Sequence, residues 1–124
     1  MQELTENKQQ SKSEQLEVRM LAFAVGIIKT LKAQKSVPFS VVDQLTRSSA
    51  SIGANYAEAC NASSKADFRN KIFIAKKEAA ETRYWIKLCI ELTSTADWSG
   101  HLQESHELLL ILQTIINSSR ASEK

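Results

Sequence analysis

The chain has 124 residues, with 16 basic and 14 acidic side chains and a net charge of +2. This length suits one domain better than two independent cores, and so mild a charge does not by itself indicate nucleic-acid binding. Three glycines and one proline are too few for the turns of an all-β sandwich or barrel, and they leave room for long helices.

The sequence shows neither a membrane span nor an export signal. No apolar run approaches the roughly 18 to 20 residues of a membrane helix, and the polar start MQELTENKQQSKSEQ lacks the apolar stretch of a signal peptide. Cys60 and Cys89 are too few for a disulfide framework, so we expect two reduced thiols in a cytoplasmic protein without membrane contact. Residues 1–12 are polar and aperiodic, which predicts a flexible lead-in.

An amphipathic helix is predicted over residues 13–34. Its apolar residues recur every three or four positions, the helical period: Leu16, Met20, Phe23, Ile27 and Leu31. Pro38 then prevents the helix from continuing.

A second helix is predicted from Ser40, a candidate N-cap with Asp43 three residues on, to about residue 60. A polar stripe runs along it beside the apolar face: Arg47, Ser51, Asn55 and Glu58. Such groups next to a core need partners, and Glu81 of the next helix is a candidate partner for Arg47. Because no nucleophile or metal ligand accompanies the stripe, we interpret the five residues as an interhelical polar network rather than a catalytic site.

A third helix is predicted to follow Ser64, an N-cap with Asp67 at the third helical position, and to run to about residue 92. It carries two apolar stripes. The first is Phe68, Ile72, Ala75, Ala79, Ile86 and Ile90; the second is Ile74, Trp85, Leu88 and Leu92. Two stripes favour a homo-oligomer in which a second subunit covers one of them; the alternative is one wide arc that faces the core.

Five basic residues lie between these stripes, within one arc of the helical wheel. This basic row consists of Lys65, Arg69, Lys76, Arg83 and Lys87. It is long enough to follow a phosphate backbone. The alternatives are a solvated face, or ion pairs with the acidic fourth helix. We expect Phe68, Phe73, Tyr84 and Trp85 to pack, so no exposed aromatic set is predicted and sequence-specific single-strand recognition is not expected.

A fourth helix is predicted from an Asp97 cap to about residue 118, with residues 119–124 as a flexible tail. Four helices with short connections predict an all-α, antiparallel up-down-up-down four-helix bundle over residues 13–118. His101 and His106 are five residues apart and lie on different faces, so they do not form an HExxH-type metal pair. With no phosphate-binding or nucleophile motif in the sequence, no catalytic residue, metal or cofactor is predicted.

The segment from Arg47 to Cys89 resembles the 23S rRNA intervening-sequence proteins (the S23 family), which are bacterial four-helix bundles. The matching motifs are R-S-x-x-S-I-x-x-N-x-x-E, S-K-A-D-F and K-E-A-x-E-T-x-Y-W-x-K-L. The family is related to the accessory variability proteins of diversity-generating retroelements, which bind a reverse transcriptase and structured RNA. The motif residues resemble a fold signature rather than a catalytic set: Arg47, Ser51, Asn55, Glu58, Glu81, Tyr84 and Trp85.

The resemblance implies a homo-oligomer, commonly a pentameric ring with a basic surface. Together with the basic row, it leads us to expect a non-enzymatic oligomeric adaptor that binds RNA or an RNA–protein complex, including one with a reverse transcriptase. The alternative is a protein–protein scaffold without nucleic acid, whose basic row meets an acidic partner.

Overall fold

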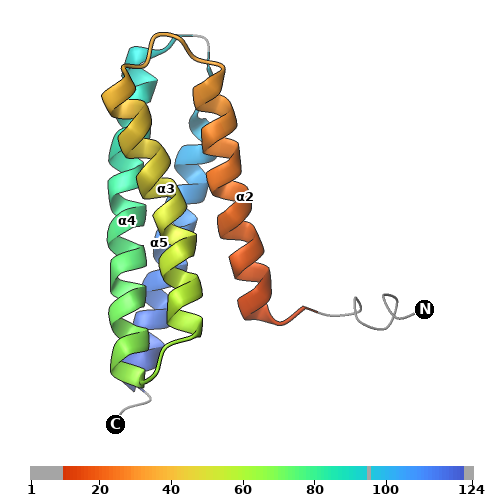
Figure 1. Ribbon diagram of the computed structural model, residues 1–124, viewed down its shortest axis with the longest axis vertical. Helices are drawn as coiled ribbons and strands as arrows, with labels where there is room; N and C mark the ends of the chain where they lie inside the picture. Colours follow the sequence, from red (N-terminus) through yellow and green to blue (C-terminus); the bar gives the residue numbers. More distant parts are fainter. Residues whose placement is uncertain (1–9, 95, 122–124) are drawn as a thin grey trace, which may run out of the picture.

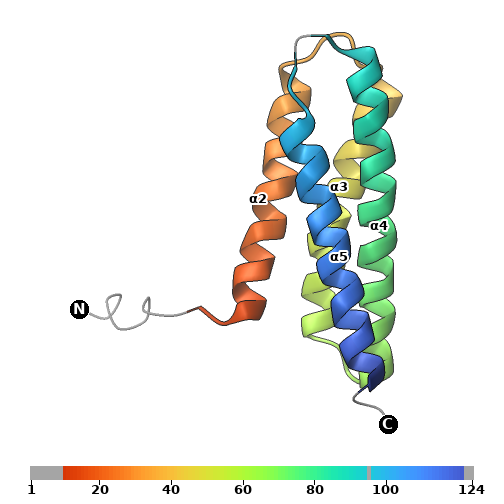
Figure 2. The same cartoon turned by 180° about the vertical axis from the view of Figure 1, so that it is seen from behind.

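The computed structural model describes residues 10–94 and 96–121, and this part of the chain forms an antiparallel four-helix bundle (Figures 1 and 2). The helices are α2 (Lys12–Lys32), α3 (Phe39–Cys60), α4 (Lys65–Leu92) and α5 (Ser99–Ala121). They run alternately up and down, and each packs against its neighbours in the chain, while α2 and α5 meet less extensively. The predicted fold class is confirmed.

The first helix begins earlier in the chain, and the last helix ends later, than predicted. At the start of α2, the Ser11 hydroxyl accepts from the Glu14 backbone N–H (3.0 Å) and the Glu14 carboxylate accepts from the Ser11 N–H (2.9 Å). This reciprocal capping box begins the helix inside the segment expected to be a lead-in. At the other end, α5 continues to Ala121 instead of stopping at residue 118. Residues 1–9 of the predicted lead-in and 122–124 of the predicted tail lie outside the described residues.

The predicted helix caps have different outcomes. The cap on α4 is confirmed, because the Ser64 hydroxyl accepts from the Asp67 N–H at 3.0 Å. The cap on α3 is wrong: Pro38 occupies the N-cap position, and Ser40 lies inside the helix. The Pro38 backbone is extended, with φ −61° and ψ 149°. Its carbonyl starts the helical hydrogen bonds without a capping side chain. Asp97 accepts from the N–H and hydroxyl of Ser99, at 3.0 and 2.7 Å, just before α5.

The core runs along the axis of the bundle and draws large apolar side chains from all four helices. Its fully buried members include Met20, Ile27, Leu45, Ile52, Ile72, Ile86, Leu108, Leu112 and Ile116. Trp98 closes the end of the bundle where α5 begins, and its indole N–H donates to the Thr93 hydroxyl at 3.1 Å. Burial of these side chains is the main source of stability.

The second apolar stripe of α4 is only partly exposed. Trp85 and Leu88 are half-buried against the core, whereas Leu92 is exposed. Trp85 and Leu88 therefore belong to the single wide arc that was the alternative to subunit contact. The homo-oligomer remains a prediction, and the partial burial of this stripe gives it no support.

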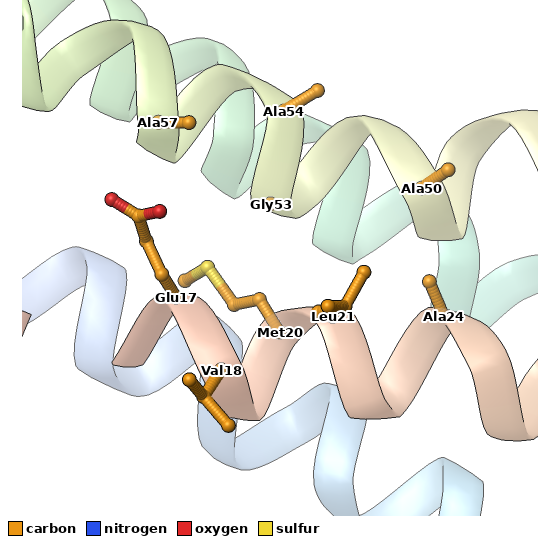
Figure 3. A pocket seen from close by; sticks show the side chains of 9 residues that line it. All are labelled: Glu17, Val18, Met20, Leu21, Ala24, Ala50, Gly53, Ala54 and Ala57. Atoms are coloured by element: carbon orange, nitrogen blue, oxygen red, sulfur yellow. The ribbon is translucent and has the colours of Figure 1, made fainter. Parts of the chain in front are cut away.

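An apolar groove lies between α2 and α3 (Figure 3). The groove between the two helices has a volume of about 410 Å³. Its lining residues are Glu17, Val18, Met20, Leu21 and Ala24 on α2 and Ala50, Gly53, Ala54 and Ala57 on α3. Leu21 is 67% exposed there. None of the described helices is long and apolar enough to span a membrane.

Candidate nucleic-acid interface

The basic row lies along one flank of α4, beside α5. Lys65 and Lys87 are exposed, and Arg69, Lys76 and Arg83 are half-buried, so no member is fully buried. Lys65 lines a shallow hollow together with Phe68 of α4 and Ile115, Ser118 and Ser119 of α5. The antiparallel packing of α4 and α5 thus places the start of the row near the end of the chain.

The carboxylates of α5 face α2 rather than the basic row. Arg19 of α2 reaches Glu104 through Nε at 2.6 Å and Glu107 through Nη2 at 2.7 Å. These contacts raise the pKa of Arg19, and hydrogen bonds from Gln103 and Arg19 lower the pKa of Glu107.

Four members of the row have no ion-pair partner within the described residues: Lys65, Lys76, Arg83 and Lys87. The predicted alternative, ion pairing with the fourth helix, is wrong for these four. Their charges remain available to an external anion.

Arg83 differs from the other members because its Nε atom is buried and has no hydrogen-bond partner among the described residues. The two terminal amino groups are not sealed in this way. The stem of the side chain is therefore packed inside while the end of the guanidinium reaches the surface. A buried N–H without an acceptor lowers the stability of the fold. In this position, however, the side chain holds its positive charge within the basic row.

The acidic residues in the middle of α4 face α3, on the opposite flank. Arg47 of α3 approaches Glu78 at 3.4 Å and Glu81 at 2.6 Å. The indole N–H of Trp85 also donates to Glu81 at 3.0 Å. The predicted Arg47–Glu81 contact is present in the structure. As a result α4 has two electrostatic sides, one acidic and neutralised by α3, the other basic and open.

The five polar residues predicted as one network do not form one. The Ser51 hydroxyl donates to the Arg47 carbonyl at 2.8 Å, and the Asn55 amide donates to the Ser51 carbonyl at 2.9 Å, both within α3. A short polar side chain readily bonds the carbonyl one turn earlier instead of crossing to a neighbouring helix. Glu58 instead pairs with Lys71 of α4 at 2.9 Å, which raises the pKa of that lysine.

A fully buried interhelical polar contact was also not predicted. The Thr82 hydroxyl of α4 donates to the Ser48 hydroxyl of α3 at 2.9 Å, and both residues are buried. The signal was present in the sequence, since Ser48 and Thr82 each fall within a family motif and on the buried side of their helix.

Two aromatic residues of α4 are on the surface, contrary to expectation. Phe68 and Trp85 pack against the core as predicted, but Phe73 is 37% exposed and Tyr84 is 61% exposed. Both are on the helical face that points away from the bundle axis. The guanidinium of Arg120 lies 5.2 Å from the centre of the Phe73 ring.

The described residues contain no group of three His, Cys, Asp or Glu side chains that could hold a metal ion. His101 is half-buried: its Nε2 lies 2.9 Å from the Thr30 hydroxyl, and burial lowers its pKa. Burial raises the pKa of the Cys89 thiol, while Cys60 is exposed and lies 3.2 Å from the Ser13 hydroxyl. None of these contacts places a nucleophile beside a base.

Comparison with known proteins identifies relatives over most of the chain. The family described as 23S rRNA-intervening sequence protein matches residues 10–117. A crystal structure of a protein of unknown function from the S23 ribosomal protein family of Bacteroides thetaiotaomicron is 38% identical, with a TM-score of 0.78. The match covers 86% of this chain and 99% of that one. No curated protein matches the chain significantly.

Proposed function

The chain belongs to the 23S rRNA-intervening sequence protein family, and from that premise we propose that it is a non-enzymatic oligomeric adaptor that binds RNA, alone or in an RNA–protein complex. The observation that carries the proposal is the charge arrangement of α4. Four members of the basic row have no carboxylate partner within the described residues. Arg19 pairs with the α5 carboxylates Glu104 and Glu107, and Arg47 pairs with Glu78 and Glu81 of α4.

The row suits phosphate better than bases. From Lys65 to Lys87 it extends about 33 Å at about 1.5 Å per residue, which is the length of several phosphate spacings. Lysine and arginine contacts to phosphate give affinity and a strong salt dependence without reading sequence.

The apolar groove between α2 and α3 supports the oligomeric part of the proposal. We propose that a second copy of the chain covers Val18, Leu21 and the small residues of α3. Assembly would repeat the basic row around the particle and strengthen its field. The family resemblance implies five subunits.

Light scattering on a size-exclusion peak tests the assembly. Leu21→Glu is expected to lower the mass to that of one chain, because a carboxylate in a buried apolar contact is costly. Leu92→Glu, at the exposed end of α4, is the matched control and is expected to retain the parent mass. A monomeric parent protein would contradict the oligomer.

RNA binding across a salt series tests the function. Lys76→Glu/Lys87→Glu is expected to abolish most of the binding and to flatten the salt dependence, because about 0.7 of a counterion is released per single-strand phosphate contact. The exposed lysines Lys29 and Lys32 of α2 give a control, Lys29→Glu/Lys32→Glu, with the same charge change outside the row.

Equal loss of RNA affinity in both double variants would mean that net charge, and not the row, determines binding. If the parent protein binds no RNA at any salt concentration, the proposal fails. The alternative, a protein–protein scaffold, then predicts that the row binds an acidic protein. A reverse transcriptase is the first such partner to test, given the resemblance to retroelement accessory proteins.

A further inference from the structure

The outward face of α4 combines exposed aromatic rings with lysines. Phe73 and Tyr84 are eleven residues apart, which places them about 16 Å apart along the helix and within about 20° of each other on its circumference. Lys77, Ala80 and Lys87 lie on the same face. We call Phe73, Lys77, Ala80, Tyr84 and Lys87 the outer strip.

A hollow adjoins the Phe73 ring. It has a volume of about 360 Å³ and is lined by Phe73, Ile74, Lys76, Lys77 and Ala80. The lining thus combines one aromatic ring, two aliphatic side chains and two lysines.

Neighbouring side chains position both rings. Arg120 of α5 lies 5.2 Å from the centre of the Phe73 ring, in a cation–π contact. Tyr84 meets Trp85 edge to face, with centroids 5.2 Å apart and planes at 75°, and Glu81 holds the Trp85 indole. Both rings are therefore exposed but oriented, which reduces the entropy that a stacking ligand must offset. Because the guanidinium lies over one face of the Phe73 ring, a stacked base takes the opposite face or displaces Arg120.

The charge on this face is positive along the interval between the two rings. Glu78 and Glu81 fall in the same part of the sequence, but they face α3 and bind Arg47. The next carboxylate in the helix is Glu91, almost two turns beyond Tyr84. An anionic ligand that spans the two rings meets lysines rather than carboxylates.

We propose that the outer strip binds single-stranded RNA, with one base stacked on Phe73 and another on Tyr84, Lys77 on the phosphates between them and Lys87 on a phosphate beyond Tyr84. This inference rests on the proposed function and narrows its ligand. The 16 Å between rings greatly exceeds the rise of about 3.4 Å between stacked bases, so the two bases are not neighbours in the strand. A duplex cannot supply them, because its base faces are already stacked.

Base stacking on an aromatic side chain tolerates any sequence and is worth about 1 to 3 kcal/mol per base by alanine substitution. The strip therefore predicts a preference for single strands over duplexes without a strong sequence preference. If the protein bound only the phosphates, removing the bases from the RNA would not weaken binding. Replacing Phe73 or Tyr84 would not weaken it either.

The test measures fluorescence anisotropy with a labelled uridine 12-mer, an abasic strand of the same length and charge, and a duplex. Phe73→Leu and Tyr84→Leu keep an apolar side chain but remove the π face. Each is expected to weaken binding of the 12-mer by roughly 5- to 100-fold, with an unchanged salt slope. Binding of the abasic strand is expected to be weaker from the start and insensitive to either change.

Two control variants separate stacking from exposure. Phe73→Tyr retains an aromatic ring and is expected to bind the 12-mer with nearly parent affinity. Phe39 is 80% exposed at the start of α3, outside the strip, so Phe39→Leu is expected to change nothing. Circular dichroism of each variant checks that the bundle is intact.

The outcomes distinguish this inference from the proposed function. Suppose that both leucine variants bind like the parent protein while Lys76→Glu/Lys87→Glu does not; the row is then functional and the stacking inference is wrong. Tighter binding of the duplex than of the 12-mer overturns the inference in the same way. A parent protein that binds none of the three nucleic acids overturns both.

Discussion

Helices α2 and α4 both pack against α3, but they do so in different ways. The α3–α4 contact contains buried small residues and a buried Ser48–Thr82 hydrogen bond, and Arg47 binds Glu78 and Glu81 across it. The α2–α3 contact opens into the groove beside Leu21 (Figure 3). Polar contacts occur in the middle of the α3–α4 contact. Between α2 and α3, the described polar contacts are those of Ser13 at the start of α2, and apolar side chains further along α2 are left partly uncovered.

Contacts at the two ends of α2 hold it on either side of the groove. Near the end where α5 begins, Thr30 contacts His101 at 2.9 Å. Near its start, the Ser13 hydroxyl lies 2.9 Å from the Tyr56 hydroxyl, and Arg19 pairs with two α5 carboxylates. Between these contacts, Val18 and Leu21 remain exposed in the groove.

The largest contrast is expected from truncating apolar side chains on the two helices. Ile86 of α4 is fully buried, so Ile86→Ala is expected to lower the free energy of unfolding by about 2 to 5 kcal/mol through lost burial and a cavity. Leu21→Ala on α2 is expected to change it by no more than about 0.5 kcal/mol in the monomer. Urea unfolding, at protein concentrations low enough for monomers, measures both.

A large effect of Leu21→Ala that grows with protein concentration would locate the missing burial in an oligomer. A large effect independent of concentration would instead mean that the groove closes within one chain. Either result contrasts with Ile86→Ala, whose cost in free energy is expected to be the same at every concentration.

The two interhelical arginines provide the next contrast. Arg47→Met leaves Glu78, whose side chain is 12% exposed, without its cation. We expect a loss of about 1 to 3 kcal/mol in the free energy of unfolding, discounted for the partial exposure of Arg47. Arg19→Met leaves two more exposed carboxylates, Glu104 and Glu107, and is expected to cost about 1 kcal/mol or less.

Thermal unfolding at low and high salt checks this pair of variants. The difference between parent and Arg19→Met is expected to shrink in high salt, because exposed ion pairs are screened. The Arg47→Met difference is expected to persist. If both variants lose the same free energy of unfolding, the ion pairs of Arg47 are no stronger than those of Arg19. The α3–α4 contact would then not differ from the contacts of α2 in its electrostatics.

A smaller contrast comes from two helical glycines with tight surroundings. A methyl group at Gly53 would meet the Met20 Cβ at 3.2 Å, and one at Gly26 would meet the His101 ring at 3.2 Å. Alanine gains about 0.5 to 1 kcal/mol over glycine within a helix. We expect Gly53→Ala to keep most of this gain because α2 can shift beside the open groove.

Gly26→Ala is expected to lose that gain and become destabilising. The His101 ring is held by Thr30 and lies beside Trp98, with ring centroids 5.7 Å apart, so it has little room to yield. Thermal unfolding measures both variants. If Gly26→Ala stabilised the protein, the residues around Gly26 would adjust to a methyl group as easily as those beside the groove.

The sequence predicted the fold well because its signals were local and repeated. Helical periodicity and the Ser64 cap gave the order, direction and approximate ends of the helices. The Arg47–Glu81 pair followed from the need of a polar stripe beside the core for a partner on the next helix. The start of α2 was missed, although Ser11 and Glu14 form a capping box, because the surrounding segment is polar and lacks apolar periodicity.

Features that depend on the relative rotation of helices could not be predicted in this way. A helical wheel gives the angle of Phe73 and Tyr84 about α4 but does not say how far α5 covers that face, so both were expected to pack. In the same way, the acidic character of α5 was visible, but the choice of Arg19 as its partner depends on how α5 is rotated toward α2. Self-assembly and RNA binding remain predictions.

The smallest expected effect is a pH dependence confined to the closed end of α2. Burial lowers the pKa of His101, an effect that Asp97 partly offsets. The unfolded chain therefore takes up a proton at a higher pH, near about 6.5, than the folded chain does. Between these two pKa values the unfolded state binds more protons, so the free energy of unfolding falls as the pH decreases.

The measurement is the parent-minus-His101→Gln difference in free energy of unfolding from pH 8 to pH 5. Glutamine retains a polar group toward Thr30 but does not titrate, so the difference is expected to be constant above about pH 7 and to decrease below about 6.5. The pKa of Glu107 is also lowered in the folded chain, but it affects stability at a more acidic pH. Both proteins contain Glu107, so its contribution cancels in the difference. A constant difference down to pH 5 would mean that water reaches the His101 ring, and that α2 is open at this end as well as along the groove.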